Sequence, residues 1–227
     1  MKFQWFQVDR IWDAGEARER RRPFEVDISF LQDCAAYCQK AAIEFMCTPF
    51  APAQVPLLDP LVVRWKVASA HVWDKALLGA MYETKKPMLV SMGAVVPESV
   101  VRAVARIQSL KNDEARPVVP LHCVSRYPAL PEEYGLRRWL ARTGLHVWGL
   151  SDHSIGIGTA IAAVTLGACV VEKHIALDEQ PKSPDDGPYA LRPPGLRALI
   201  AGIRQAEAAL GGEVAPAKFP DGRKVWR

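Results

Sequence analysis

Short runs rich in β-branched and aromatic residues alternate with helix-like segments along most of this chain. Seven such runs are evident, at 2–6, 43–47, 62–69, 87–91, 117–125, 146–151 and 168–174. Apolar residues fill successive positions in these runs, which is typical of strands buried on both faces of a parallel sheet. About seven helical segments lie between and after the runs. The alternation therefore predicts an α/β protein in which helices cover a parallel sheet.

Two of the helical segments carry a clear apolar spacing. In the first, Val100, Val104 and Ile107 fall at i, i+4 and i+7 after Pro97, a residue suited to a first helical turn. The second follows Pro193-Pro194, and its apolar positions are Leu196, Leu199, Ile200, Ile203 and Leu210. Both segments are predicted to be amphipathic helices.

The number of strand–helix units indicates a particular α/β fold. Seven units are one fewer than in a (β/α)8 barrel, and 227 residues is close to the roughly 250 typical of that fold. The first run begins at residue 2, so we expect a TIM-type barrel that is incomplete at the N-terminus. We predict a single barrel domain over residues 1–215, followed by a tail at 216–227.

Composition narrows the functional classes. The chain has 29 Lys and Arg against 25 Asp and Glu, a net charge of +4 that gives little support for nucleic-acid binding. The basic run RERRR (18–22) either attracts anions or forms a solvated loop, and the loop is favoured. No run of eighteen apolar residues is present, so we expect no membrane span. The five scattered cysteines are typical of reduced thiols in a cytoplasmic protein.

Polar residues gather where the predicted strands end. These are Lys2, Gln4, Thr48, Lys66, Ser69, Ser91, His122, Ser125, Ser151, His153 and the segment 172–174. In a parallel barrel the carboxyl ends of the strands share one rim, where the active site lies. Each residue alone is adequately explained as an ordinary strand-end cap. Their recurrence over seven strands favours a shared active site.

His153 and His174 lie at the ends of two consecutive predicted strands, which makes them neighbours in space. Two imidazoles that converge on one rim can hold a divalent cation and leave positions open for water and substrate. The alternative is a pair of hydrogen-bonded structural histidines. The adjacent acids Asp152 and Glu172 either orient the rings or form salt bridges.

Lysine is unexpected inside an apolar strand, yet Lys2 and Lys66 occupy such positions. Burying an ammonium group without an anionic partner is costly, which favours a phosphate or carboxylate site. Thr48, Ser69 and Ser91 would donate hydroxyl hydrogen bonds to it. The alternative is that both lysines extend to solvent at the barrel mouth.

The segment SPDDGP (183–188) follows the last predicted strand and has the composition of a turn. Asp185 lies eleven residues beyond His174, so its carboxylate could return over the barrel mouth. The sequence contains no Walker loop, GxGxxG fingerprint, GxSxG elbow or HExxH motif.

Seven stretches, taken in order, resemble one known family. They are KFQ (2–4), CTPF (47–50), KVAS (66–69), LHCVSRYP (121–128), GLSDHSIGI (149–157), LGACVVEKHIALD (166–178) and PDDG (184–187). They are similar to the sialic acid synthases, a family that includes N-acetylneuraminate, legionaminate and pseudaminate synthases and spore-coat polysaccharide relatives. The likeness runs over nearly the whole chain.

The resemblance implies a TIM barrel that condenses phosphoenolpyruvate with the open-chain aldehyde of an N-acylated amino sugar, such as N-acetylmannosamine. The products are a nine-carbon 2-keto sugar acid and phosphate, used in surface-polysaccharide biosynthesis. The implied cofactor is Mn²⁺, with Mg²⁺ or Co²⁺ as alternatives, and its implied ligands are His153 and His174. A homodimer is implied as well.

The resemblance also implies roles for the remaining polar residues. The phosphoenolpyruvate cradle would comprise Lys2, Thr48, Lys66, Ser69, Ser91 and Ser151, with Gln4 as a further substrate-binding residue. Ser125, Tyr127 and Asp185 would bind the sugar. The catalytic set would then be His153, His174, Lys66, Tyr127 and Asp185.

The sequence departs from the family pattern in several places. An opening strand and helix, with a glutamate implicated in sugar binding and catalysis, do not precede KFQ, and no antifreeze-like domain follows GRKVWR. His71 stands where the family's KxxSGE segment has an acid, and would be either a third metal ligand or a sign of lost activity. The segment SMGA (91–94) keeps Ser91 but lacks the family's threonine. The alternative to an active synthase is therefore a truncated or divergent barrel that keeps ligand or metal binding without turnover.

Overall fold

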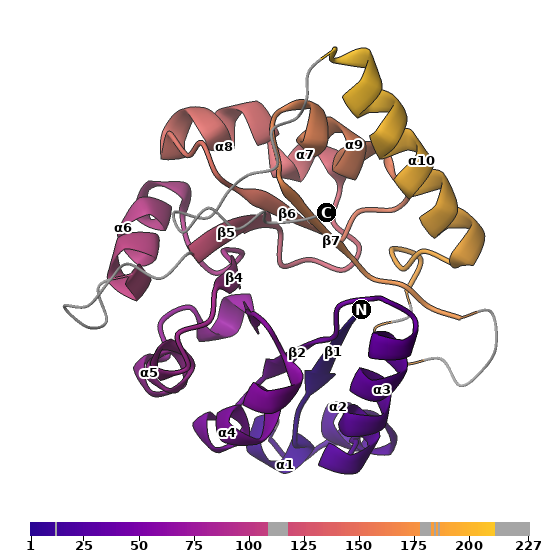
Figure 1. Ribbon diagram of the computed structural model, residues 1–227. Coiled ribbons are helices and arrows are strands. Elements are labelled where there is room, and N and C mark those ends of the chain that lie inside the picture. The colour runs from indigo at the N-terminus through magenta and orange to yellow at the C-terminus, as the bar shows by residue number, and fades with distance from the viewer. Residues whose placement is uncertain (12, 109–117, 178–182, 184, 186, 212–227) are drawn as a thin grey trace. The chain divides into compact units, whose positions relative to one another are not determined.

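A computed structural model describes residues 1–11, 13–108, 118–177, 183, 185 and 187–211 (Figure 1). Among these residues, seven strands alternate with helices along the chain. The chain divides into two compact units, which we call unit 1 (Met1–Val90 and Ala105–Val118) and unit 2 (Ser91–Val104 and Val119–Arg227). Each unit is described by itself.

Unit 1 contains two parallel strand pairs. β1 (Lys2–Trp5) pairs with β2 (Met46–Pro49), so that Gln4 lies opposite Thr48. β3 (Trp65–Val67) pairs with β4 (Met88–Ser91), with Lys66 opposite Leu89. Every residue of β2, β3 and β4 is buried, which explains why these runs are apolar at successive positions.

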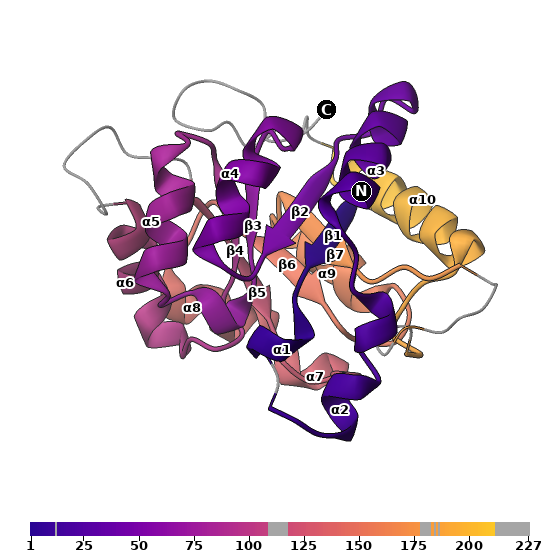
Figure 2. The same ribbon diagram turned by 90° about the horizontal axis from the view of Figure 1, so that it is seen from below.

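The two longer connecting helices of unit 1 begin at acidic N-caps. In α3 (Ile28–Lys40), which joins β1 to β2 and runs beside them (Figure 1, Figure 2), the carboxylate of Asp27 accepts a hydrogen bond from the Phe30 backbone N–H at 2.9 Å. In α5 (Lys75–Glu83), Asp74 accepts from the Leu77 N–H at 3.0 Å. Such caps satisfy donors that the first helical turn leaves open. Short helices, namely α1 (Val8–Ile11), α2 (Glu16–Glu19) and α4 (Val55–Leu58), complete the unit.

The basic run at 18–22 is a surface segment whose charges are balanced locally. Arg22 forms ion pairs with Asp9 at 2.8 Å and with Glu19 at 2.9 Å, and Arg18 contacts the same two acids at 3.4 and 3.3 Å. The predicted loop is wrong in part, because Arg18 and Glu19 belong to α2. The local acids favour the solvated interpretation of this run over an anion-binding patch.

Unit 2 is built on three parallel strands in the order β5, β6, β7. They span Val118–Cys123, Gly149–Asp152 and Val170–Lys173. Leu121 lies opposite Gly149, and Gly149 lies opposite Val170. A Cβ at Gly149 would approach Leu121 Cδ2 to 2.6 Å and the Val170 carbonyl oxygen to 2.7 Å, so the centre of this sheet has room only for glycine.

Helices cover the three strands of unit 2 on one side (Figure 1). They are α7 (Pro131–Tyr134), α8 (Leu136–Thr143), α9 (Gly158–Thr165) and α10 (Pro193–Ala209). The small residues between the two histidines form α9, which joins β6 to β7 as the alternation predicts. Gly202 of α10 allows a close approach to α9, because a Cβ there would meet Ile161 Cδ1 at 2.7 Å.

Both predicted amphipathic helices are confirmed. α6 (Pro97–Gln108) buries Val100, Val104 and Ile107. In α10 the apolar face is narrower than the sequence predicts, because Leu199 is buried whereas Ile200 and Leu210 are exposed. The close contact at Gly202 places the packed face of α10 around Leu199 and turns Ile200 outward.

The seven predicted strands all occur, with ends displaced by up to three residues, and the α/β prediction is confirmed. Residue 117, where one predicted run begins, and the predicted tail at 216–227 lie outside the described residues. The single-domain assignment over 1–215 stays a prediction. In the part of the chain that the structure describes, no helix is long and apolar enough to span a membrane.

Candidate active site

His153 and His174 lie side by side at the ends of β6 and β7. Each follows the last residue of its strand, and these last residues, Asp152 and Lys173, are register partners. The imidazole centroids are 5.5 Å apart, with ring planes at 70°. Two imidazoles bound to one ion at about 2.1 Å have ring centres within about 7 Å of each other. The spacing therefore fits a shared divalent cation.

The protein environment fixes the orientation and the tautomer of the His153 ring. Nδ1 lies 2.7 Å from the Val124 carbonyl oxygen, which can only accept, so Nδ1 carries the proton and donates it. This arrangement leaves the lone pair of Nε2 available to a cation. Burial lowers the pKa of His153 to about 4, so the ring is neutral at physiological pH.

Backbone contacts hold His153 from two further directions. Its N–H donates to the Tyr134 hydroxyl at 2.7 Å, and its carbonyl accepts from the Ala129 N–H at 3.1 Å. His174 is tied in a similar way, because its carbonyl accepts from the Leu191 N–H at 2.8 Å. Both histidines are therefore fixed by bonds to segments other than their own strands.

Two tyrosines complete an aromatic cluster around the histidines. The Tyr127 ring lies 4.1 Å from His153 and 5.8 Å from His174, measured between centroids. Tyr189 lies 5.2 Å from His174 and 5.4 Å from Tyr127. The sequence analysis did not single out Tyr189. The glycine two residues before it, Gly187, could have indicated a bulky neighbour at this point of the chain. A Cβ at Gly187 would lie 2.2 Å from Tyr189 Cε1, so the glycine of PDDG makes room for this ring.

Asp185 lies in an exposed turn close enough to Tyr127 to act on it electrostatically. The pKa of the Tyr127 hydroxyl is raised by burial first and then by the negative charge of neighbouring groups, which include Cys123, Asp185 and Glu172. The hydroxyl therefore stays protonated and can donate a hydrogen bond. Asp185 thus acts on Tyr127 through its negative charge. Pro184 and Asp186 lie outside the described residues.

The two acids next to the histidines each have a partner outside the imidazole rings. Asp152 forms an ion pair with Lys173 at 2.8 Å. Glu172 accepts a hydrogen bond from the Ser151 hydroxyl at 2.8 Å. Of the two alternatives for Asp152, the salt bridge is the one observed. The hydrogen bond between Ser151 and Glu172 shows that these two side chains lie on the same face of the sheet.

Two more predicted binding residues belong to unit 2. Ser91 is buried at the end of β4, and Ser125 is exposed just beyond β5. A Cβ at Gly93 would lie 2.3 Å from the Ser125 hydroxyl oxygen, so Gly93 leaves space for that hydroxyl.

The remaining predicted binding residues lie in unit 1. Lys2, Gln4 and Ser69 are half-buried, whereas Thr48 and Lys66 are buried. Lys66 is 3% exposed and its ammonium group donates to the Val67 carbonyl at 3.0 Å, so the alternative in which this lysine extends to solvent is wrong. Thr48 Oγ1 is buried and, among the described residues, has no hydrogen-bond partner. A buried hydroxyl of this kind is suited to bind a ligand.

His71 has a local structural environment in unit 1. Its Nδ1 lies 3.4 Å from the carboxylate of Asp74, and its ring meets Phe50 edge-on at 5.4 Å between centroids. Asp74 also caps α5. Within the described residues, no three His, Cys, Asp or Glu side chains form a metal-binding group, so His71 as a third ligand gains no support.

The sequence profile of the NeuB family matches residues 2–215, which is nearly the whole chain. The chain belongs to the NeuB family. Two curated relatives have similar sequences. It is 31% identical over 232 residues to an uncharacterized protein of Methanocaldococcus jannaschii, covering 99% of this chain. It is also 31% identical over 206 residues, 88% of this chain, to the N,N'-diacetyllegionaminic acid synthase of Campylobacter jejuni.

The fold of this NeuB-family chain is similar to that of a solved sialic acid synthetase. Its structure matches that of N-acetylneuraminic acid synthetase from Leptospira borgpetersenii with a TM-score of 0.83 and 28% identity, covering 93% of this chain and 74% of the other. The chain spans 66% of the length of the Methanocaldococcus relative and 60% of that of the Campylobacter synthase.

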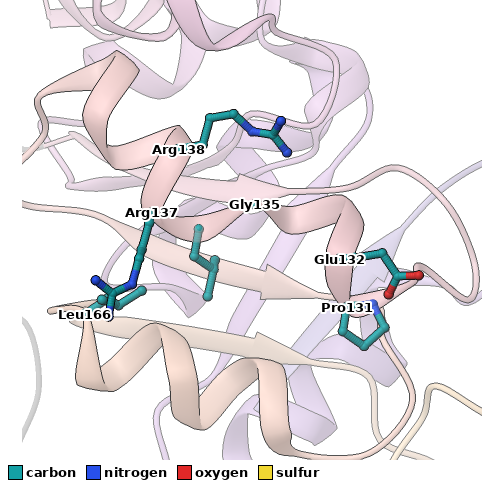
Figure 3. A pocket seen from close by; sticks show the side chains of 7 residues that line it. Pro131, Glu132, Gly135, Arg137, Arg138 and Leu166 are labelled. Carbon is teal, nitrogen blue, oxygen red and sulfur yellow. The ribbon is translucent and has the colours of Figure 1, made fainter.

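A separate open pocket of the NeuB-family chain is lined by none of the predicted site residues (Figure 3). Its lining consists of Pro131, Glu132, Gly135, Leu136, Arg137, Arg138 and Leu166. In Figure 3, Arg137 points toward Leu166, whereas Arg138 points away from it. We assign this pocket no role in the chemistry.

His122 lies away from the predicted rim, so the prediction for this residue is wrong. Its ring stacks on Trp139 at 4.6 Å, and its Nε2–H donates to the Tyr134 carbonyl at 2.7 Å. Strand alternation is the cause, since neighbouring Cys123 faces His153 and His122 must face the helices. Burial lowers the pKa of His122 below its ordinary value of 6.5.

We expect this buried histidine to make the metal-free chain sensitive to acid. Below pH 6.5 the unfolded chain takes up a proton at His122 that the folded chain resists, so the free energy of unfolding falls by up to about 1.4 kcal/mol per pH unit. His153 acts in the same direction. The variant His122→Gln should therefore show a shallower fall between pH 7 and pH 5 in urea unfolding. The exposed residue His146 supplies the control, and equal slopes for His122→Gln and His146→Gln would contradict the prediction.

Proposed function

We propose that this NeuB-family chain condenses phosphoenolpyruvate with the open-chain aldehyde of an N-acylated amino sugar. The methylene carbon of phosphoenolpyruvate attacks the aldehyde carbon. Water then adds to the neighbouring carbon that carries the phosphate, and phosphate leaves with the bridging oxygen. The products are a nine-carbon 2-keto sugar acid and inorganic phosphate. The names of its relatives, a legionaminic acid synthase and a sialic acid synthetase, support this class of product.

The pairing of His153 and His174 is the observation that carries the proposal. The two rings meet on adjacent strand ends, and His153 directs its unprotonated nitrogen away from Val124. His153 and His174 would hold a divalent cation, Mn²⁺ first and Mg²⁺ or Co²⁺ as alternatives, which supplies Lewis acidity for polarising a carbonyl oxygen.

The other residues would bind and orient the two substrates. We propose that Lys2, Thr48, Lys66, Ser69, Ser91 and Ser151 hold the phosphate and carboxylate groups, with Gln4 beside them. The buried ammonium of Lys66 and the buried hydroxyl of Thr48 support this role. Tyr127, Ser125 and Asp185 would bind the sugar, Tyr127 as a donor through its protonated hydroxyl. Positioning and charge would then provide most of the rate.

The finer structural expectations also stay proposals. We propose that the chain folds as a TIM-type barrel in one domain over 1–215, and the match to the sialic acid synthetase fold supports it. We also propose a homodimer, on the family resemblance, and a cytoplasmic location, on the five scattered cysteines.

The activity is tested by incubating the purified chain with Mn²⁺, phosphoenolpyruvate and N-acetylmannosamine and measuring phosphate release. We expect release that depends on both the amino sugar and the cation, with a product of the combined mass in mass spectrometry. Omitting the sugar controls for simple hydrolysis, and EDTA controls for the cation. Mn²⁺ binding without turnover on any N-acylated hexosamine would instead favour the non-catalytic barrel.

A further inference from the structure

Strand alternation places two different sets of side chains on the two faces of β6 and β7. Ser151, His153, Glu172 and His174 share one face, as their mutual contacts show. Asp152 and Lys173 therefore point to the opposite face, where their carboxylate and ammonium groups lie 2.8 Å apart. This ion pair is directly beneath the histidine pair, one residue before each ring.

The ion pair is the centre of a buried network around His153. Lys173 Nζ donates to Asp152 Oδ2 and also to the Ser154 carbonyl. Asp152 Oδ1 accepts from the backbone N–H of Ser154 at 2.8 Å and from its hydroxyl at 2.7 Å. The Ser154 and Thr159 hydroxyls are 2.9 Å apart, which connects the network to the first turn of α9.

Stability alone does not explain a pair in this position. The side chains of Lys173 and Asp152 are 3% and 0% exposed, so both charges have lost nearly all contact with water. Apolar residues of similar volume in place of a buried ion pair commonly give equal or greater stability. What an apolar pair cannot supply is a directed bond from β7 to the residues on both sides of His153.

We propose that the Asp152–Lys173 pair is a positioning device for the two histidines. Lys173 Nζ donates to the carboxylate of Asp152, the residue before His153, and to the backbone carbonyl of Ser154, the residue after it. Because Lys173 immediately precedes His174, the same contacts fix the separation of the two rings. The pair touches neither substrate nor cation and acts through the backbone that carries the ligands. The inference rests on the proposed function in one respect, that the histidines bind a divalent cation.

The test removes both charges at once and keeps the side-chain sizes. In the double variant Asp152→Asn/Lys173→Met, the amide oxygen still accepts from the Ser154 N–H, so the fold has a comparable core. We expect the dissociation constant for Mn²⁺, measured by electron paramagnetic resonance of the free ion, to rise about 10- to 100-fold, as is usual when groups behind metal ligands are removed. Ring ¹⁵N spectra of the metal-free variant should show both tautomers of His153, against the Nδ1–H form alone in the unmodified chain.

A destabilised control separates positioning from a purely structural role. Leu199→Ala removes buried apolar contacts of α10 and lowers the melting temperature, and it should keep the Mn²⁺ affinity and the His153 tautomer unchanged. A double variant that folds, binds Mn²⁺ as tightly as the unmodified chain and keeps the His153 tautomer would overturn the positioning role. The proposed metal site itself would then still stand. Failure of the unmodified chain to bind Mn²⁺, or undiminished binding by His153→Ala, would overturn the metal site and the inference with it. Should this double variant not fold, Asp152→Leu/Lys173→Met, an apolar pair of similar volume, removes the same two charges and gives the same comparison.

Discussion

Replacing His153 with alanine is expected to abolish Mn²⁺ binding in the micromolar range and to lower phosphate release at least about 1,000-fold. Two imidazoles would be the only protein ligands that we assign among the described residues, so loss of one leaves a single nitrogen. Lewis acidity lowers such barriers by several kcal/mol, and about 4 kcal/mol corresponds to a 1,000-fold change in rate. Titration calorimetry with Mn²⁺ and a phosphate-release assay measure the two effects separately.

His146→Ala is the matched control for this experiment. His146 belongs to unit 2 as well and is exposed, so the same substitution there should change neither metal binding nor turnover. His174→Ala should reproduce the His153→Ala result, because the two rings are equivalent donors in the proposal. Retention of tight Mn²⁺ binding in both single variants would show that the cation binds elsewhere.

Replacing Lys66 with methionine is expected to lower activity without lowering stability. The ammonium of Lys66 is buried, so its removal relieves a desolvation cost, and methionine has a similar length. The melting temperature should therefore be unchanged or higher. A hydrogen bond to a charged group contributes up to about 3 kcal/mol, so kcat/KM for phosphoenolpyruvate should fall about 100-fold.

Lys75→Met provides the same substitution on an exposed lysine of unit 1. This variant should keep both the melting temperature and kcat/KM. A Lys66→Met variant that is destabilised yet fully active would show that Lys66 serves the fold and takes no part in binding the phosphate or carboxylate. Scanning calorimetry and initial-rate kinetics at saturating amino sugar distinguish these outcomes.

The secondary structure could be predicted because its signals are local. The runs around Lys66 and Cys123 are apolar on both faces, and their period alone indicates buried parallel strands. The helices after Pro97 and Pro193 follow from the 3.6-residue spacing of their apolar positions. The ends of the elements were displaced by a few residues, since strand ends depend on partners that are distant in the sequence.

The sequence predicted that His153 and His174 lie close together, but it did not show how either ring is held. The order of the motifs around His153 and His174 pointed to a metal pair, and the structure places the two rings together. His122 was assigned to the rim, and the role of Asp152 was left open, because a one-dimensional pattern does not show which face a strand-end residue takes. Tyr189 was missed because its contact with His174 depends on how the intervening chain returns.

The sequence by itself determined the strand–helix alternation, the family and the pair of histidines, because periodicity and motif order are written along the chain. Tertiary structure decided the tautomer of His153, through the carbonyl of Val124, and the partner of Asp152, through Lys173. These contacts join residues 29 and 21 positions apart in the chain. Hydrogen bonds of this kind depend on distances and angles between atoms of different strands, and such geometry exists only once the chain has folded.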